Sequence, residues 1–331
     1  MISIRNMAAA AGVAALGFAA AVPAIAQDAC QGFPSGPVII QVPFAPGGGA
    51  DRTFRLFAPY LSQEIGVPVQ VTNVAGGGGW VSWGEVANNW TDENADHKLA
   101  VVNLPHVFSL LNPDMQRSET LDSFNFLAWH SYDPGLWLVR WDDDRFQNLQ
   151  DVIDYAKEQP LVVSPGNHGG DDHVGLAFAE KAVPEMQMKY IFSDGGDNEK
   201  IQLLLSNTAD MVAGNVGYYV NGIMERKMRP IAVLHDEPWI ILPSVPTFQE
   251  ITGKKNITYA GRTLVAANGL ADCKRDIYLA AIEKAMSNPE YVQKENANRN
   301  FLLYMTGDEM WEALRAGQAV AEEARYWEET Q

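Results

Sequence analysis

Cysteine and positive charge are both scarce in this sequence. Of its 331 residues only Cys30 and Cys273 are cysteines, and 24 lysine and arginine residues face 41 aspartate and glutamate residues, which gives a formal net charge of −17. Nucleic acid is therefore not an expected partner, because its phosphates repel so acidic a chain. The same acidity favours a soluble monomer and disfavours the binding of anions, unless the binding site is locally positive.

Apolar runs long enough to cross a bilayer are also missing after the first 26 residues. Met1–Ala26 contains a single basic residue, Arg5, then a small-residue apolar run over Met7–Val22, and it ends in Ala24-Ile25-Ala26. The run is short for a membrane span, and the pattern is typical of a secretory signal peptide cleaved before Gln27. The exported chain would then carry 23 basic and 41 acidic residues, a formal charge of −18.

Export bears on the two cysteines. An oxidising compartment permits cysteines to pair, so we expect one disulfide between Cys30 and Cys273. Such a bond would tie the first segment of the mature chain to the last. Two isolated thiols are the alternative.

Two common motifs are absent as well. Neither Gly47–Gly49 nor Gly76–Gly79 fits the Gly-x-Gly-x-x-Gly spacing of dinucleotide-binding proteins, and Gly253-Lys254 lacks the upstream glycine of a phosphate-binding loop. The Gly-x-Ser-x-Gly elbow of many hydrolases does not occur either. The sequence therefore argues against nucleotide binding and gives hydrolysis little support.

A glycine-rich turn near the N-terminus is what the sequence does offer. Val38–Val42 has the β-branched composition of a buried strand, Gly47–Gly49 follow it, and Phe54–Ile65 carries apolar residues at helical spacing. Consecutive glycines let backbone N–H groups point at a ligand at the positive end of a helix, and an anion is the natural guest there. A tight turn without any ligand is the alternative.

The same pattern repeats further along the chain. Val67–Val71 predicts a second strand, Gly76–Gly79 a second turn and Val81–Asn89 a helix, with further strands at Leu99–Val102 and Phe124–Trp129. Strands that alternate with helices indicate a parallel sheet covered by helices. In open sheets of this kind, ligands lie outside the carboxyl ends of the strands, where both glycine turns fall.

The second half of the chain predicts another α/β lobe. A break is expected at Asp133-Pro134-Gly135, before a strand at Leu136–Val139, and the closing helices are expected within 276–286 and 308–327. Two such lobes favour a cleft that encloses a small molecule by closure. The predicted parts are a signal peptide at 1–26, the first lobe at 27–130, the second lobe at 131–258, and a return strand with C-terminal helices packing on the first lobe at 259–331.

At this level of detail the chain resembles the periplasmic solute receptors of tripartite tricarboxylate transporters, the Bug (TctC-like) receptors. The resemblance rests on Val42–Asp51 and Gly76–Gly79, and on the order of Gly195-Gly196, Ala209–Met211 and Leu242–Phe248. It implies an α/β, two-lobed periplasmic-binding-protein (Venus flytrap, type II-like) architecture with a ligand cleft between the lobes. It also implies a periplasmic location, and delivery of an organic acid to membrane permease subunits. In such receptors one ligand carboxylate is held by the two glycine loops of the first lobe.

Several positions depart from the family pattern. Where the family often has a neutral donor entering the second-lobe helix, this chain has Asp171-Asp172, and Ser193-Asp194 stands where a Tyr-Lys pair is common. Trp80 replaces a small amide side chain, and Asn103–His106 replaces a loop rich in Gly, Thr and Ser. The far end of the pocket is therefore expected to differ from that of its relatives.

The acidic loop raises a question of charge. A second ligand carboxylate directed at Asp171, Asp172 or Asp194 would be repelled unless a cation or proton intervened. Three alternatives stay open: a monoacid that presents an amine or hydroxyl group to the acids, a bridging metal ion, or aspartates that turn outward. We favour an outward or helix-capping role for at least one of them, since aspartate at a helix start accepts hydrogen bonds from free N–H groups.

Candidate ligand-binding residues lie on both lobes, and no cofactor or catalytic residue is predicted. Asp51 is expected to stabilise the helix start or to hold a water molecule rather than to contact the anion directly. Trp80, directly after four glycines, is expected to face the cleft. A metal-mediated binder is the competing class, with His168, Asp171, Asp172 and His173 as its ligands. A hydrolase using Ser164 and these histidines is a remote third alternative, because a triad is a spatial arrangement that a local cluster cannot establish. The full set of candidates is Phe44, Gly47, Gly48, Gly49, Asp51, Gly77, Gly78, Gly79, Trp80, Ser164, Gly166, His168, Asp171, His173, Gly195, Gly196 and Asn215.

Overall fold

The computed structural model describes residues 30–91, 95–193, 195–325 and 327–328. The predicted signal peptide and Asp194 lie outside the described residues. The chain divides into two compact units, Met1–Phe33 and Pro34–Gln331. In the first unit a turn is described, in which the N–H of Phe33 donates to the carbonyl of Cys30, and the disulfide expected at Cys30 stays a prediction. All elements below belong to Pro34–Gln331.

Strands and helices alternate along most of this unit. The first elements are β1 (Val38–Val42), α2 (Gly49–Ile65), β2 (Val69–Asn73), α3 (Trp80–Asn89), β3 (Lys98–Leu104) and β4 (Asn125–Arg140). The middle elements are α4 (Leu149–Glu158), β5 (Leu161–Gly166), α5 (Asp171–Ala182), β6 (Met188–Phe192), α6 (Gly196–Leu205), β7 (Met211–Asn215), α7 (Val216–Met224), β8 (Met228–Leu234) and α8 (Phe248–Thr252). The last elements are β9 (Tyr259–Ala266), α9 (Asp272–Ser287), α10 (Pro289–Ala297), β10 (Leu302–Met305) and α11 (Gly307–Ala324). No helix in the described ranges is both long and apolar enough to span a bilayer.

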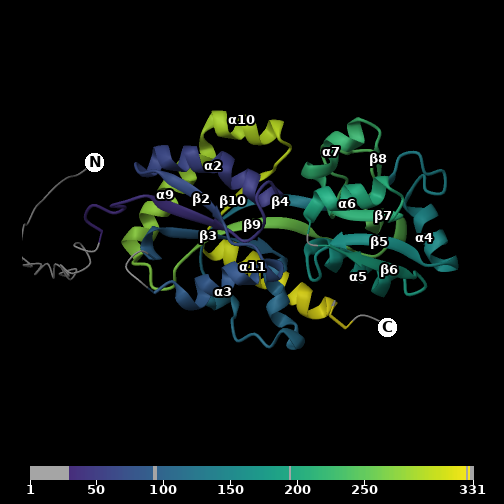
Figure 1. Cartoon of the computed structure of the whole chain (residues 1–331), viewed down its shortest axis with the longest axis horizontal. Helices are drawn as coiled ribbons and strands as arrows, with labels where there is room; N and C mark the ends of the chain where they lie inside the picture. The colour runs from purple at the N-terminus through teal and green to yellow at the C-terminus, as the bar shows by residue number, and fades with distance from the viewer. Residues whose placement is uncertain (1–29, 92–94, 194, 326, 329–331) are drawn as a thin grey trace, which may run out of the picture. The chain divides into compact units, whose positions relative to one another are not determined.

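The strands form two lobes that share β4. The strand order is β2-β1-β3-β9-β4-β7-β5-β6, and β8 and β10 also pair with β4. We call β1, β2, β3, β9 and β10, with the N-terminal part of β4, the first lobe, and β5–β8, with the C-terminal part of β4, the second lobe. In Figure 1, β4 and β9 lie between the other strands of the first lobe and those of the second, and helices lie on either side. This confirms the predicted two-lobed α/β fold class.

The predicted break at Asp133-Pro134-Gly135 is wrong, because β4 runs through it without interruption. Its residues up to Pro134 pair with β9, and those from Gly135 onward pair with β7 and β8. Gly135 is required here, since an added Cβ would clash with the hydroxyl of Thr258. The Pro-Gly pair therefore marks the point where one strand passes from the first lobe to the second. The predicted lobe boundaries themselves stay a prediction.

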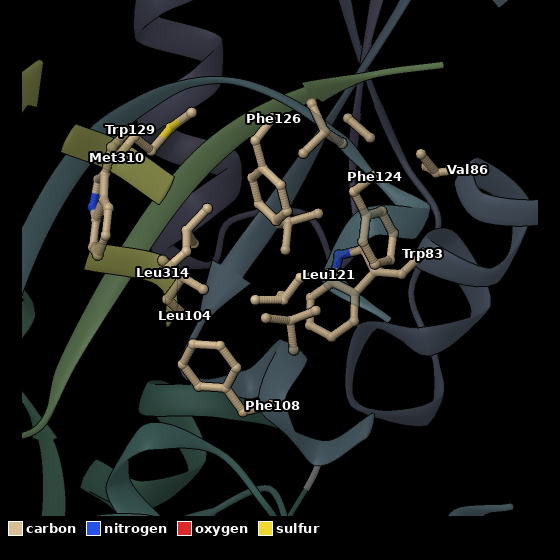
Figure 2. Packing of buried hydrophobic residues seen from close by; sticks show 14 of the residues in the cluster. Trp83, Val86, Leu104, Phe108, Leu121, Phe124, Phe126, Trp129, Met310 and Leu314 are labelled. Atoms are coloured by element: carbon tan, nitrogen blue, oxygen red, sulfur yellow. The ribbon is translucent and has the colours of Figure 1, made fainter. Parts of the chain in front are cut away.

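The core of the first lobe packs large aromatic side chains between its sheet and α3 and α11. Trp83, Phe108 and Phe124 are at most 2% exposed, and Met310 and Leu314 of α11 join them. Figure 2 shows these side chains directed toward one another from separate elements. Burying a side chain of this size contributes roughly 1.5–3 kcal/mol to stability, so this cluster holds the C-terminal helix against the lobe.

The core of the second lobe lies on both faces of its sheet. Trp137 and Val139 of β4 belong to one cluster, and Leu136 and Leu138 belong to another. Successive side chains of a strand point to opposite faces, so a strand buried on both faces reads as a continuous apolar run. This is why Leu136–Val139 has no polar residue.

The segment between α9 and α11 is more structured than the sequence predicts. Pro289–Ala297 forms α10, and Leu302–Met305 forms β10 against β4. Asn288 caps α10 by accepting hydrogen bonds from the N–H groups of Glu290 and Tyr291. The turn between α10 and β10 then lies beside α2, where the side-chain amide of Asn300 donates to the hydroxyl of Thr53 at 3.2 Å.

Candidate functional site

The first glycine turn is held in place by Asp51. The carboxylate of Asp51 is 2% exposed and accepts hydrogen bonds from the N–H of Gly47 at 2.8 Å, from Nε of Arg55 at 2.9 Å and from the amide of Asn73 at 2.8 Å. Burial alone would raise the pKa of Asp51, but the hydrogen bonds from Arg55, Gly47 and Asn73 outweigh it and lower the pKa. Asp51 therefore organises the turn, and the N–H of Gly47 is engaged within the protein.

The second glycine turn needs its glycines for the backbone conformation. Gly76, Gly77, Gly78 and Gly79 all have positive φ, and the N–H of Gly79 donates to the carbonyl of Gly76. An added Cβ at Gly79 would also lie 2.7 Å from the ring of Trp83. The ring of Trp83, one turn into α3, therefore packs directly against the backbone of Gly79.

Trp80 lies in the hydrophobic core of the first lobe, and its place at the ligand stays a prediction. It is 3% exposed, its indole N–H donates to the hydroxyl of Ser109 at 2.6 Å, and its ring packs edge-on against Trp83. The guanidinium of Arg117 covers the remaining face at 3.9 Å from the ring centroid. A tryptophan fits there because its apolar ring is buried while its N–H finds a partner.

Asp171 and Asp172 both point inward, so the prediction of an outward or capping role for one of them is wrong. Asp172 is 6% exposed and pairs with Nζ of Lys200 at 2.6 Å, and Asp171 is 4% exposed and accepts from the amide of Asn215 at 2.7 Å. The residue preceding α5 is Gly170, and no side chain caps the helix. Sequence reasoning missed Lys200, the cation that allows Asp172 to be buried.

Lys200 joins two acidic residues in the second lobe. Its ammonium group also lies 2.8 Å from Asp197 and donates to the carbonyl of Ala213 at 2.9 Å. Burial by itself would lower the pKa of Lys200, but the carboxylates of Asp172 and Asp197 raise it well above its usual value. Lys200 is therefore protonated at neutral pH, and it holds α5, α6 and β7 together.

His106 faces the start of α5 from the first lobe. Its Nδ1 lies 3.6 Å from a carboxylate oxygen of Asp171, and an added Cβ at Gly170 would lie 3.0 Å from its Nε2. Burial lowers the pKa of His106 to about 4, so the imidazole is neutral at pH 7. The side chain of His106, rather than open space, thus lies against the second-lobe helix start that the resemblance assigns to ligand binding.

A polar cavity of about 210 Å³ lies between elements of both lobes. Its walls come from the start of α2, from β4 and β9, from the starts of α6 and α7, and from the end of α10. The lining residues are Gly49, Arg52, Thr53, Asp133, Asp197, Asn215, Gly217, Tyr218, Asn221, Arg262, Glu295, Ala297, Asn298, Arg299 and Asn300.

Arg262 is the buried cation of this cavity. It is 7% exposed, and its Nη1 makes only long hydrogen bonds of 3.4 Å, to the hydroxyl of Ser131 and the amide oxygen of Asn300. Its Nε has no hydrogen-bond partner, and its guanidinium forms no ion pair with any described residue. Gly49 at the start of α2 lies so close that an added Cβ would be 2.8 Å from Nη2 of Arg262.

Asp133 lines the same cavity and is a buried acid with no cationic partner among the described residues. It is 4% exposed, and its carboxylate accepts only from the N–H of Gly217, at 3.0 and 3.2 Å, among the described residues. Burial raises the pKa of Asp133 to about 7. The other lining acids are better satisfied: Asp197 by Lys200, and Glu295 by the hydroxyl of Tyr291 and the amide of Asn300.

Two of the candidate residues, Gly49 and Asn215, line this cavity. Asp171 accepts a hydrogen bond from the amide of Asn215. Gly47 and Gly48 form the turn that precedes Gly49, and the N–H of Gly47 donates to Asp51 of α2. The remaining candidates lie elsewhere. In the first lobe, Phe44 packs on Trp83 and His106, and Gly77–Gly79 lie at the start of α3. In the second lobe, Ser164 is buried in β5, and Gly166 lies over the stem of Lys200. His168 and His173 pack with Phe192, and Gly195 and Gly196 lie at the start of α6.

Arg52, Asp133 and Arg262 are lining residues that sequence reasoning missed. Arg262 had a visible signal, because it is the single charged residue in the strand predicted at 259–267. A charged residue inside a strand that is otherwise apolar is rarely buried without a partner or a function. Arg52 lies one turn into α2 and extends over the ring of Tyr218 in the second lobe, 4.6 Å from its centroid.

The residues proposed for a metal ion do not gather around one point. Asp172 is engaged by Lys200 and Asp171 by Asn215. In the part of the chain that the structure describes, no group of three or more His, Cys, Asp or Glu side chains could hold a metal ion. The structure therefore gives no observation that favours a metal-mediated site.

A two-lobed α/β fold with a polar cavity lined by both lobes defines a solute-binding protein. The family model described as "Tripartite tricarboxylate transporter family receptor" matches residues 53–312, and the chain belongs to this family. Its members are receptors that bind a solute, not enzymes.

Relatives and solved structures agree with this assignment. The "UPF0065 protein in the TAR-I ttuE-ttuC' intergenic region" of Agrobacterium vitis is 41% identical over 292 residues, which cover 85% of this chain and 80% of that protein. A Rhodopseudomonas palustris protein solved with adipate is similar with a TM-score of 0.74 at 19% identity, over 88% of this chain and 98% of that one. MatC of the same organism, solved with bound malate, has a TM-score of 0.72 at 21% identity, over 89% and 99% of the two chains. At these identities the solved structures establish the fold.

Proposed function

We propose that this protein is a periplasmic receptor that captures a small organic acid in the 210 Å³ cavity and delivers it to the membrane permease subunits of a tripartite tricarboxylate transporter. One observation carries the proposal: Arg262 is a buried cation without an ion pair among the described residues, and it lines the cavity. A buried charge is costly unless it is paired, so a ligand carboxylate is the partner that this guanidinium lacks.

The first turn of α2 supports the same ligand chemistry. Gly49 places the positive end of this 17-residue helix at the cavity wall beside Arg262. The cavity is smaller than the roughly 300 Å³ that suits a drug-sized ligand, which favours a small acid. A protein of formal charge −17 has no general attraction for anions, so the positive charge must be built into the site.

A thermal-shift screen of the chain from Gln27 onward tests the proposal. Mono-, di- and tricarboxylates, including malate and adipate, are added with and without a chelator. A ligand at 100 times its Kd stabilises the native protein by about 2.7 kcal/mol. With an unfolding entropy of about 2.1 cal/mol/K per residue, a chain of this length shifts by roughly 1.6 °C per kcal/mol, so the melting temperature should rise by about 4 °C. If no acid raises it in either condition, organic-acid binding is wrong.

The Arg262→Gln variant connects any such hit to the cavity. Removing a charged hydrogen-bond donor costs about 1.5–3 kcal/mol, so the acid should bind roughly 10- to 100-fold more weakly. Arg275→Gln is the matched control, because Arg275 lies on α9 and contacts Asp272 and Asp276 rather than the cavity. Unchanged affinity in a folded Arg262→Gln protein would move the carboxylate site away from this cavity.

A further inference from the structure

Arg262 and Asp133 are diagonal neighbours on one face of the sheet. In the antiparallel pairing of β4 with β9, Arg262 lies opposite Ser131, and Asp133 follows two residues further along β4. Diagonal neighbours lie about 7–8 Å apart, within reach of each other's long side chains. Nevertheless the two form no ion pair, and both line the cavity. Each buried charge is thus left with room for a ligand group of opposite sign.

The surrounding side chains do not satisfy either charge. Asp171 on α5 and Asp197 on α6 repel a negative charge at Asp133 and raise its pKa, whereas Arg262 is the cation that lowers it. Asp197 and Glu295, the other acids of the cavity wall, already have partners in their own lobes. Asp133 is therefore the acid in the cavity whose carboxylate lacks a cationic or strong donor partner among the described residues.

We propose that the cavity recognises an α-amino acid head group, whose carboxylate binds Arg262 beside Gly49 and whose ammonium group binds Asp133. The inference rests on the proposed function and deepens it, since it names the class of acid. An α-amino acid carries the two charges on groups bonded to the same carbon, which matches a guanidinium and a carboxylate that face one cavity without touching. Burial raises the pKa of Asp133 to about 7, and a ligand ammonium group beside it would lower that pKa.

The rest of the wall indicates a polar ligand side chain. Beyond the head-group pair, the cavity is lined by Arg52, Tyr218, Asn221, Asn298 and Asn300, and no large aliphatic side chain is among its lining residues. Amide and hydroxyl groups of this kind fix the orientation of a polar ligand through hydrogen bonds. An acidic or amide amino acid suits such a wall better than a branched aliphatic one.

Matched pairs of ligands test the inference on the wild-type protein, without any variant. By isothermal titration calorimetry we would compare aspartate with succinate, glutamate with glutarate, and each amino acid with its N-acetyl derivative, which has no positive charge. The 20 amino acids are screened first by thermal shift. We expect the free amino acid of at least one pair to bind at least tenfold more tightly than both of its partners, because those leave Asp133 buried and unpaired.

The Asp133→Asn variant tests whether Asp133 causes the preference for the free amino acid. It should remove most of the difference in affinity between the free amino acid and its succinate, glutarate or N-acetyl partner. Asp144→Asn, an exposed aspartate in the loop before α4, is the control. A preference that survives in a folded Asp133→Asn protein would overturn the assignment of Asp133.

The outcomes separate this inference from the proposed function. If succinate or glutarate binds as tightly as its amino acid or more tightly, the head-group proposal is wrong and the organic-acid receptor stands. If neither amino acids nor plain organic acids bind, the proposed function fails and the head-group proposal fails with it.

Discussion

Lys200 is predicted to be the most costly single cation to remove from the second lobe. Its ammonium group is buried and lies within 2.9 Å of Asp172, Asp197 and the carbonyl of Ala213. In Lys200→Met the apolar stem is kept, but two buried carboxylates lose their counter-ion. Removing one partner of a buried ion pair costs about 3–5 kcal/mol, because the other charge is left uncompensated.

The destabilisation should depend on pH in a defined direction. In the wild type, interactions with Lys200 lower the pKa of Asp197, although burial alone would raise it. The contribution of Asp197 to the stability of the native state is therefore present above its unfolded pKa and is lost as the pH falls. In the wild type, burial already raises the pKa of Asp172 to about 7. Without Lys200, burial raises the pKa of Asp172 further and raises that of Asp197 too, and a raised folded pKa costs stability once pH rises through it. The difference between variant and wild type should therefore be largest near pH 7–8 and shrink toward pH 4.

Urea unfolding followed by tryptophan fluorescence at pH 7.5 and pH 4.5 measures both effects. Lys157→Met is the control, since Lys157 is 41% exposed and its nearest carboxylate oxygen, on Asp154, is 3.9 Å away. The double variant Lys200→Met/Asp172→Asn should recover part of the loss, because one of the two unpaired charges is gone. A loss below about 1 kcal/mol at pH 7.5, or a loss that grows toward acid, would refute the reasoning.

Two further predictions concern single features of the chain. Trp80→Phe should lower stability by about 1–2 kcal/mol, since the hydroxyl of Ser109 loses its donor in the core, and should leave ligand affinity unchanged; a weaker affinity in the folded variant would restore Trp80 to the binding site. The exported protein should begin at Gln27 and contain a disulfide between Cys30 and Cys273, which intact-mass measurement with and without reductant checks. A mass that shows two alkylatable thiols before reduction would contradict the disulfide.

Local patterns predicted the framework of this fold well. The strand before Gly47–Gly49, the helix after it and the two-lobed class all follow from periodicity and turn residues, which depend on near neighbours in the chain. The interruption expected at Pro134-Gly135 was wrong for an instructive reason. The pair looks like a turn in isolation, but the partners on either side, β9 and then β7 and β8, keep the strand extended while it changes sheets.

The candidate site was less predictable because its members are brought together by tertiary structure. Arg262 and Gly49 are separated by more than 200 residues, and the end of α10 reaches the cavity only because α10 packs beside α2. Asp172 looked like a surface or capping residue until Lys200, 28 residues later, supplied its counter-ion. Charge in a sequence shows which groups need partners, but the fold decides which partners they find.

The location of the head-group pair has a consequence for how ligand binding is transmitted. Arg262 lies on β9 and Asp133 lies one residue before Pro134, where β4 passes from the first lobe to the second. A ligand that joins these two charges would therefore bear on the two strands that meet at the lobe junction, rather than on surface loops alone. Lobe closure in binding proteins is a motion of one lobe about such a junction. Ligands that satisfy both charges should stabilise the closed form more than acids that satisfy Arg262 alone, because a ligand shifts a conformational equilibrium only by its difference in affinity for the two states.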